Sequence, residues 1–276
     1  MRALFLVAVS ICSLSASAQY YYKDIIGTRE SGDLIRNYIK NKVSRVILTS
    51  YDAENTRIQD FLIEQQFSPT TGILKTISSS AQSNPSILLT YADANGNVIK
   101  TVDSSNLVVS VTSYSYNDAG KLIEIAHSSS DSARFLHKSD QHLWYWNGDK
   151  PARMLRIKNG NDTTLVEFKH DANGNVIEET ETRRNVRSVP VYYYYNEENQ
   201  LTDIVRHNPK VGILLPEYMF EYSENGEVIQ KITVPINNPD YLIWRYQYNA
   251  NGLKTKEAIY DKYKSLSGKI EYQYVF

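Results

Sequence analysis

Hydrophobic and polar side chains alternate along most of the chain, in short segments that end at turns. From Val43 onward each segment carries aromatic residues at alternate positions, then an Asp, Asn and Gly turn, then two adjacent aliphatic residues, as in 168–177 (FKHDANGNVI). A period of two is typical of β-strands, because successive side chains point to opposite faces. The pattern therefore predicts β-hairpins over residues 43–276.

The turns have a chemistry that explains their residues. In the turn 171–174, Asp171 can accept hydrogen bonds from backbone amides, and Gly174 can adopt the positive φ that closes a type I turn with a bulge. Asn199 replaces the glycine in one copy, and Asn is the residue that tolerates this conformation best after Gly. The anchor positions of the copies are Asn55, Gly72, Gly96, Gly120, Lys150, Gly174, Asn199, Gly226 and Gly252. Their near-constant spacing predicts about nine tandem repeat units.

Aromatic residues recur six and four positions before these anchors. Both positions share one strand face, so stacked units would form aromatic ladders, with roughly 0.2–1 kcal/mol from each cross-strand pair. The pairs include Tyr114 and Tyr116, Trp144 and Trp146, Phe168 and His170, Tyr193 and Tyr195, Phe220 and Tyr222, and Tyr246 and Tyr248. A total of 22 tyrosines against 7 phenylalanines agrees with half-buried strand surfaces.

The segment 19–42 has a different pattern. Leu34, Tyr38 and Ile39 lie at roughly helical spacing, with Lys and Arg between them, which predicts one short amphipathic helix. This helix could cover the first edge of the sheet, since an open edge invites unwanted pairing. Alternatively, it could serve as an arm that binds a partner.

The first eighteen residues are typical of a secretory signal peptide. Arg2 precedes an apolar run over residues 3–12, and the small residues Ala16 and Ala18 predict cleavage after Ala18. The run is too short to span a bilayer. We therefore expect an exported protein, periplasmic or extracellular at the cell surface, with a leader (1–18), an N-terminal segment (19–42) and a repeat domain (43–276).

Composition limits the kinds of bond and binding site that the mature chain can have. Cys12 is the only cysteine and lies in the leader, so the mature chain would have no disulfide and no thiol nucleophile. The net charge of −1 becomes slightly more negative when Arg2 is removed, and we expect that a charge of this size recruits neither nucleic acid nor anionic lipid.

Two copies of the repeat carry a resemblance to a known family. Residues 116–122 (YNDAGKL) and 248–253 (YNANGL) resemble the tyrosine-aspartate (YD) repeats of Rhs-type bacterial proteins, which also occur in teneurins. The resemblance implies an all-β fold of tandem antiparallel hairpins that wind into a long twisted or coiled sheet. The short helix would precede this sheet.

Histidine residues and acidic turns are the candidates for catalytic and metal sites, and both have simpler structural explanations. His137 and His142 flank a polar segment that looks like a solvated loop, without the spacing of a zinc motif. Asp93 to Asn97 superficially resembles a calcium loop, but its glycine comes fourth instead of sixth and no bidentate Glu follows at the twelfth position. We therefore expect no catalytic, cofactor-binding or metal-binding residues. The alternative is an enzyme, which would need a polar cleft where His137, His142, Asp140 or Glu residues converge.

The main hypothesis is a non-enzymatic scaffold of the bacterial envelope that acts through structure or surface interactions. The alternative is a carbohydrate-binding module that uses its aromatic face to stack on sugar rings. The candidate ligand face is Trp144, Trp146, Trp244, Tyr193 and Tyr195. Envelope polysaccharide or another surface protein would be the partner.

A third interpretation is an outer-membrane β-barrel. The last segment, 270–276, has aromatic residues at alternate positions and ends in Phe276, as final strands of such barrels do. Membrane insertion is disfavoured because the mean hydropathy is −0.44 and the repeat itself produces the aromatic alternation.

Overall fold

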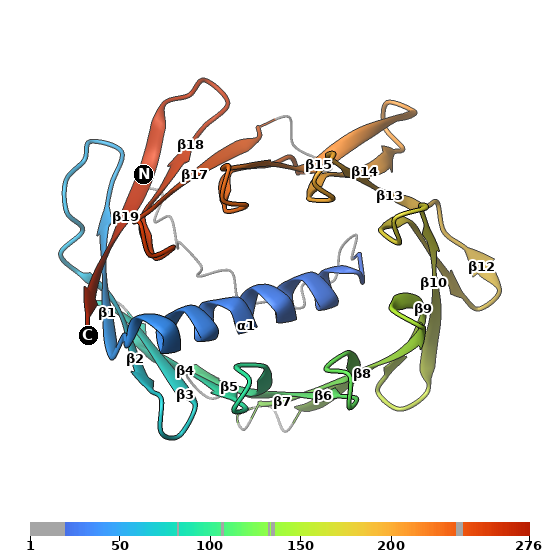
Figure 1. Cartoon of the computed structure of the whole chain (residues 1–276), viewed down its shortest axis with the longest axis horizontal. Coiled ribbons are helices and arrows are strands. Elements are labelled where there is room, and N and C mark those ends of the chain that lie inside the picture. The colour runs from blue at the N-terminus through green and yellow to red at the C-terminus, as the bar shows by residue number, and fades with distance from the viewer. Residues whose placement is uncertain (1–19, 82, 106–107, 132, 134–135, 236–239) are drawn as a thin grey trace.

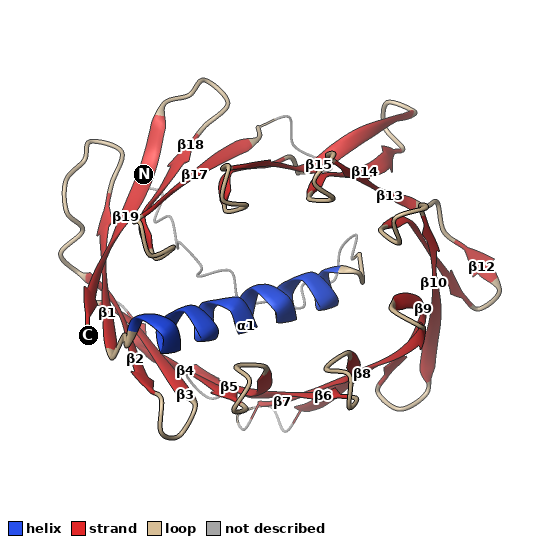
Figure 2. Ribbon diagram, in the orientation of Figure 1, coloured by secondary structure: helices blue, strands red, loops and turns tan. Residues whose placement is uncertain are grey.

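The computed structural model describes residues 20–81, 83–105, 108–131, 133, 136–235 and 240–276. The predicted leader and its cleavage site lie outside the described residues. Within the described residues the chain forms one helix and nineteen strands (Figure 2). The elements are α1 (Lys23–Asn41), β1 (Arg45–Tyr51), β2 (Phe61–Ser68), β3 (Ile73–Ser80), β4 (Ser83–Ala92), β5 (Val98–Ser105), β6 (Val108–Tyr116), β7 (Leu122–Asp131), β8 (Leu136–Asn147), β9 (Lys150–Lys158), β10 (Asp162–His170), β11 (Val176–Arg183), β12 (Val186–Arg187), β13 (Val191–Tyr195), β14 (Leu201–Asn208), β15 (Ile213–Tyr222), β16 (Val228–Thr233), β17 (Leu242–Tyr248), β18 (Lys254–Tyr260) and β19 (Leu266–Val275).

The strands close into a barrel. Neighbours along the chain pair antiparallel, and β1 pairs with both β2 and β19. The short strand β12 and strand β13 both pair with β11 and take one position in the wall, so the ring has eighteen positions. Figure 1 shows this ring, with α1 lying inside the lumen.

Closure of the ring contradicts the fold that was predicted from the sequence. The prediction of a long twisted or coiled sheet is wrong, and so is the spiral that the resemblance to YD-repeat, Rhs-like proteins implied. Strands β1 and β19, which would otherwise be the two free edges of the sheet, pair with each other. Their register runs from Arg45 opposite Val275 to Tyr51 opposite Lys269. A closed barrel has no exposed edge, whereas a spiral keeps two. Of the three interpretations, only the barrel describes this shape.

The predicted turns lie where the anchors placed them. Eight of the nine anchors have positive φ, from 60° at Asn199 to 91° at Gly174, and only Lys150 does not, because Gly148 (φ 55°) takes this role in its turn. In the turn 171–175 the Asp171 carboxylate accepts a 2.8 Å hydrogen bond from the Asn175 amide. The turns from Gly72 to Gly252 all lie at one end of the barrel, here called the turn rim; the other end is the hairpin rim.

The aromatic ladder lies on the inner wall, and its hydroxyl groups tie neighbouring units together. The aromatic residue four positions before an anchor donates a hydrogen bond to the carbonyl two positions after the preceding anchor, through its hydroxyl group or, at Trp146, its indole N–H. Tyr274 makes the equivalent bond from the last strand. These bonds are Tyr116 to Val98 (2.8 Å), Trp146 to Leu122 (2.8 Å), Tyr195 to Val176 (2.9 Å), Tyr222 to Leu201 (2.7 Å), Tyr248 to Val228 (3.0 Å) and Tyr274 to Lys254 (2.7 Å). A phenylalanine could not make this bond, which explains the excess of tyrosine.

Helix α1 is longer than predicted and has a different role. It begins at Lys23 and fills part of the lumen instead of covering a sheet edge (Figure 1). Ile35 and Tyr38 are buried against β1, β2 and β3, and the Tyr38 hydroxyl donates a 2.6 Å hydrogen bond to Gln65. Leu34 and Ile39, which the sequence placed on the buried face, are exposed.

Two glycines with similar φ allow a matched test of the turns. Replacing Gly120 (φ 73°) by Ala should cost about 1 kcal/mol, because an L-residue is strained there and nothing else crowds the site. Replacing Gly72 (φ 66°) should cost about 1–3 kcal/mol more, because the new Cβ would lie 2.4 Å from the Ala92 carbonyl oxygen. Urea unfolding of both variants measures the difference; equal losses would contradict the close approach at Gly72.

Candidate functional site in the lumen

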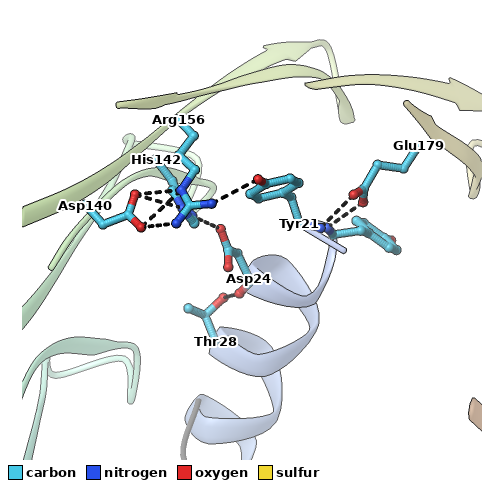
Figure 3. Close-up of polar contacts among 8 residues, drawn as sticks. Tyr21, Asp24, Thr28, Asp140, His142, Arg156 and Glu179 are labelled. Carbon is cyan, nitrogen blue, oxygen red and sulfur yellow. Dashed lines mark hydrogen bonds and ion pairs between the residues drawn. The ribbon is translucent and has the colours of Figure 1, made fainter. Parts of the chain in front are cut away.

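A cluster of charged side chains lies in the lumen where the first turn of α1 meets the barrel wall (Figure 3). The wall strands β8, β9 and β11 supply its polar groups on their inward faces, opposite the start of the helix. The members, here called the N-terminal latch, are Tyr21, Asp24, Asp140, His142, Arg156 and Glu179.

His142 is held between two carboxylates. Its Nδ1 lies 2.6 Å from Asp24 Oδ2, and its Nε2 lies 3.6 Å from Asp140 Oδ1, a distance too long for a hydrogen bond. The His142 and Asp24 side chains are only 4% and 7% exposed. Burial alone would lower the pKa of His142, but the two carboxylates outweigh it and raise this pKa to about 9. His142 is therefore a buried imidazolium paired with the helix.

Arg156 connects Asp140 to Tyr21, which lies two residues before the first residue of the helix. Its Nε lies 2.9 and 3.0 Å from the two Asp140 oxygens, and its Nη1 donates a 3.2 Å hydrogen bond to the Tyr21 hydroxyl. Burial acts to raise the pKa of Asp140, but the positive charge of His142 and the hydrogen bonds and charge of Arg156 hold this pKa well below the usual range of a carboxyl group. Asp140 is thus an anion that two cations share.

Glu179 caps the helix from the barrel wall. Its carboxylate accepts hydrogen bonds from the backbone amides of Tyr21 (2.7 Å) and Tyr22 (2.9 Å) and from the Tyr193 hydroxyl (2.7 Å). The N-cap residue Tyr22 provides no side-chain cap of its own, so Glu179 satisfies donors that would otherwise be orphaned. Burial raises the pKa of Glu179, and the three donors oppose this shift.

The arrangement anchors the start of the helix. Each of its carboxylates is occupied by a partner within the cluster. No group of three or more metal-ligating side chains occurs among the described residues. Across the same part of the chain, no helix is long and apolar enough to cross a membrane.

The predicted ligand face belongs to the barrel interior. Trp144 and Tyr193 are buried at 3% and 2% exposure, and Trp144 stacks on Phe168 with ring centroids 5.2 Å apart. Trp146 and Tyr195 are half-buried and donate the inter-unit hydrogen bonds described above, and Trp244 is also half-buried. The structure therefore does not bring these five residues together as an exposed platform for sugars.

The sequence predicted the latch only in part, because the enzyme alternative named Asp140, His142 and Glu residues but gave them no role in holding a helix. His142 was placed in a solvated loop, but it lies buried on β8. A signal existed, since Asp140, His142 and Trp144 alternate on the face that carries the aromatic ladder. Glu179 stands among other acidic residues and has no such signal.

The imidazolium of His142 predicts a pH dependence of stability. The pKa of His142 is raised from 6.5 to about 9 in the folded chain, so the protonated imidazole stabilises the fold. This stabilisation is fully present below pH 6.5 and is lost as the pH rises through about 9. The free energy of unfolding should therefore fall between pH 6.5 and 9 by at most ~3 kcal/mol.

Urea unfolding across this pH range measures the effect in the wild type, in His142→Gln and in the control His207→Gln, which changes an exposed histidine. The fall should disappear only in His142→Gln. An unchanged fall in that variant would show that another group is responsible.

Comparisons with known proteins add similarities of fold only. No protein-family model matches the chain, and no curated protein is similar to it in sequence. A crystal structure of a porin-like protein from Bacteroides uniformis is similar over 84% of this chain and 98% of that one, with 9% identity and a TM-score of 0.44. The TcdB2-TccC3-Cdc42 structure matches over 79% of this chain and 12% of that one (12% identity, TM-score 0.35), and the Photorhabdus luminescens Tc holotoxin pore over 75% and 15% (10% identity, TM-score 0.21). TM-scores below 0.5 carry no inference about function.

Proposed function

We propose that this chain is an exported, non-enzymatic β-barrel of the bacterial envelope, whose outer wall faces water and whose lumen is occupied by its own N-terminal helix. In this proposal the barrel serves as a closed structural or interaction body, not as an open pore. The observation that carries the proposal is the polar character of the outer wall.

Charged and amide side chains pair with one another across the outer wall. Strands β19, β1 and β2 carry the contacts Lys269 to Glu271 (2.7 Å), Tyr51 to Glu271 (3.1 Å), Arg45 to Glu64 (2.8 Å) and Gln66 to Glu64 (2.7 Å). Further contacts are Gln141 to Glu124 (2.6 Å), Lys169 to Glu178 (2.8 Å) and Gln230 to Glu221 (2.7 Å). A Lys or Arg at the bilayer midplane costs about 2–4 kcal/mol. An outer wall with these groups on many strands is suited to water.

The occupied lumen supports a closed body. The latch fixes the start of α1, and Asn37 near its end donates a 3.1 Å hydrogen bond to the Gly252 carbonyl at the turn rim. Aromatic side chains of the inner wall pack against the segment before the helix, with Tyr22 and Tyr193 ring centroids 5.4 Å apart. The helix is thus bound at both ends.

A second candidate is a porin-like barrel that is inserted in the outer membrane and plugged by α1. Closure of the ring favours it, as do four isoleucines that follow the turns at equivalent positions and are 37–41% exposed. They are Ile99, Ile123, Ile177 and Ile229. These side chains would contact lipid in this candidate.

Cell fractionation distinguishes the two candidates. We expect a high-salt wash without detergent to release the protein from the periplasm or cell surface, and the released protein to remain in the supernatant after ultracentrifugation. The double variant Ile99→Ser/Ile177→Ser should be recovered equally well, because its changes face water. Recovery only with detergent in the outer-membrane fraction, reduced further by the double variant, would contradict the proposal and support the inserted barrel.

A further inference from the structure

Two hairpin connections at the hairpin rim carry strongly exposed aliphatic side chains. On the connection between β11 and β13, Val186 is 71% exposed and Val189 is 60% exposed. On the connection between β14 and β15, Val211, Ile213 and Leu214 are 58%, 55% and 46% exposed. Figure 1 shows both hairpins projecting outward from the ring. Residues 183–189 and 209–214 are here called the aliphatic tips.

The two aliphatic tips are close neighbours in the wall. Arg183 pairs with Val186 at the first tip, and Asn208 pairs with Ile213 at the second. Only the pairing of β13 with β14, which sets Val191 opposite Arg206, separates them. Both tips therefore lie at the same end of the barrel and can meet one surface together.

The charge around the tips is positive, although the chain as a whole has a net charge of −1. Residues 182–190 and 205–216 contain no Asp or Glu. They contain Arg183, Arg184, Arg187, Arg206 and Lys210. Arg183 is paired with Asp162 and Arg206 with Glu217. Among the described residues, Arg184, Arg187 and Lys210 have no ion-pair partner.

We propose that the aliphatic tips dock on an anionic phospholipid surface. Aliphatic side chains at projecting tips can enter the boundary between headgroups and acyl chains, while flanking Arg and Lys side chains bind lipid phosphates. A protein partner would be expected to bind aromatic anchors in a pocket, whereas these tips are convex and carry aliphatic side chains without an aromatic residue.

The opposite end of the barrel is suited to face away from such a surface. The turns of the turn rim expose acidic side chains, which anionic headgroups repel. They include Asp118, Glu197, Glu198 and Glu224. Docking by the aliphatic tips would thus orient the barrel, with its turn rim in water.

Vesicle co-sedimentation of the full chain, purified without detergent, tests the docking surface. The probes are phosphatidylcholine vesicles with and without phosphatidylglycerol. We expect binding to the phosphatidylglycerol vesicles, weakening as the salt concentration rises, and little binding to phosphatidylcholine alone. Equal binding to both vesicle types, or binding to neither, would overturn the proposal.

Matched variants locate the surface. Arg187→Gln/Lys210→Gln should bind about twentyfold more weakly, because each cation near an anionic surface contributes roughly fivefold. Val186→Ser/Ile213→Ser should lose about tenfold or more, through the loss of buried aliphatic groups. The controls are Lys40→Gln on the exposed side of α1 and Ile99→Ser/Ile177→Ser on the outer wall, and both should bind like the wild type. Binding that the controls weaken as much as the tip variants would overturn the assignment to the tips.

The vesicle experiment tests the docking surface separately from the water-facing barrel. If the protein is recovered without detergent but binds neither vesicle type, the docking surface is wrong and the proposal of a water-facing outer wall is unaffected. Protein that inserts into the vesicles and resists alkaline extraction contradicts both.

Discussion

The pairing of β1 with β19 determines what the rest of the structure can be. Seven residue pairs join strands from the two ends of the chain, and they convert a row of hairpins into a ring. Without them both terminal strands would expose unpaired backbone groups, which invite association with other chains. With them every wall strand has two neighbours, and the chain acquires an inside and an outside with different chemistry.

The chain fills part of the lumen of this ring by two means. Aromatic side chains of the repeat cover the inner wall, and their hydroxyl or indole groups donate hydrogen bonds to backbone carbonyls of the preceding unit. Helix α1 then occupies part of the remaining space, and the N-terminal latch fixes its start. The latch contains buried charges, which would be costly if unpaired. His142, Asp140 and Arg156 compensate one another, so the cluster gives the helix one defined position.

The sequence contains the local structure but not the closure. The turns at Gly96, Gly120 and Gly226 and the inward face of each strand follow from neighbouring residues, since turn chemistry and period-two alternation are local. The pairing of β1 with β19 joins residues more than two hundred positions apart. The one hint near Tyr274 is the run of alternating aromatic residues that ends in Phe276, and the repeat itself produces the same pattern, so this hint does not identify the pairing. The same reason explains the latch, because Glu179 meets Tyr21 only after the ring has formed. A repeat alone is compatible with a spiral or a ring, and the terminal strands decide between them.

Crosslinking of the terminal strands tests the closed barrel most directly. Ile47 and Gln273 lie opposite each other in the register of β1 and β19 and flank the inward-facing Leu48 and Tyr272. In a Cys12→Ser background, Ile47→Cys/Gln273→Cys should form an intramolecular crosslink with a short thiol-reactive reagent, whereas the control Ile47→Cys/Leu165→Cys, on β1 and β10, should not. Crosslinks only between molecules, or none in the first variant, would contradict a closed barrel.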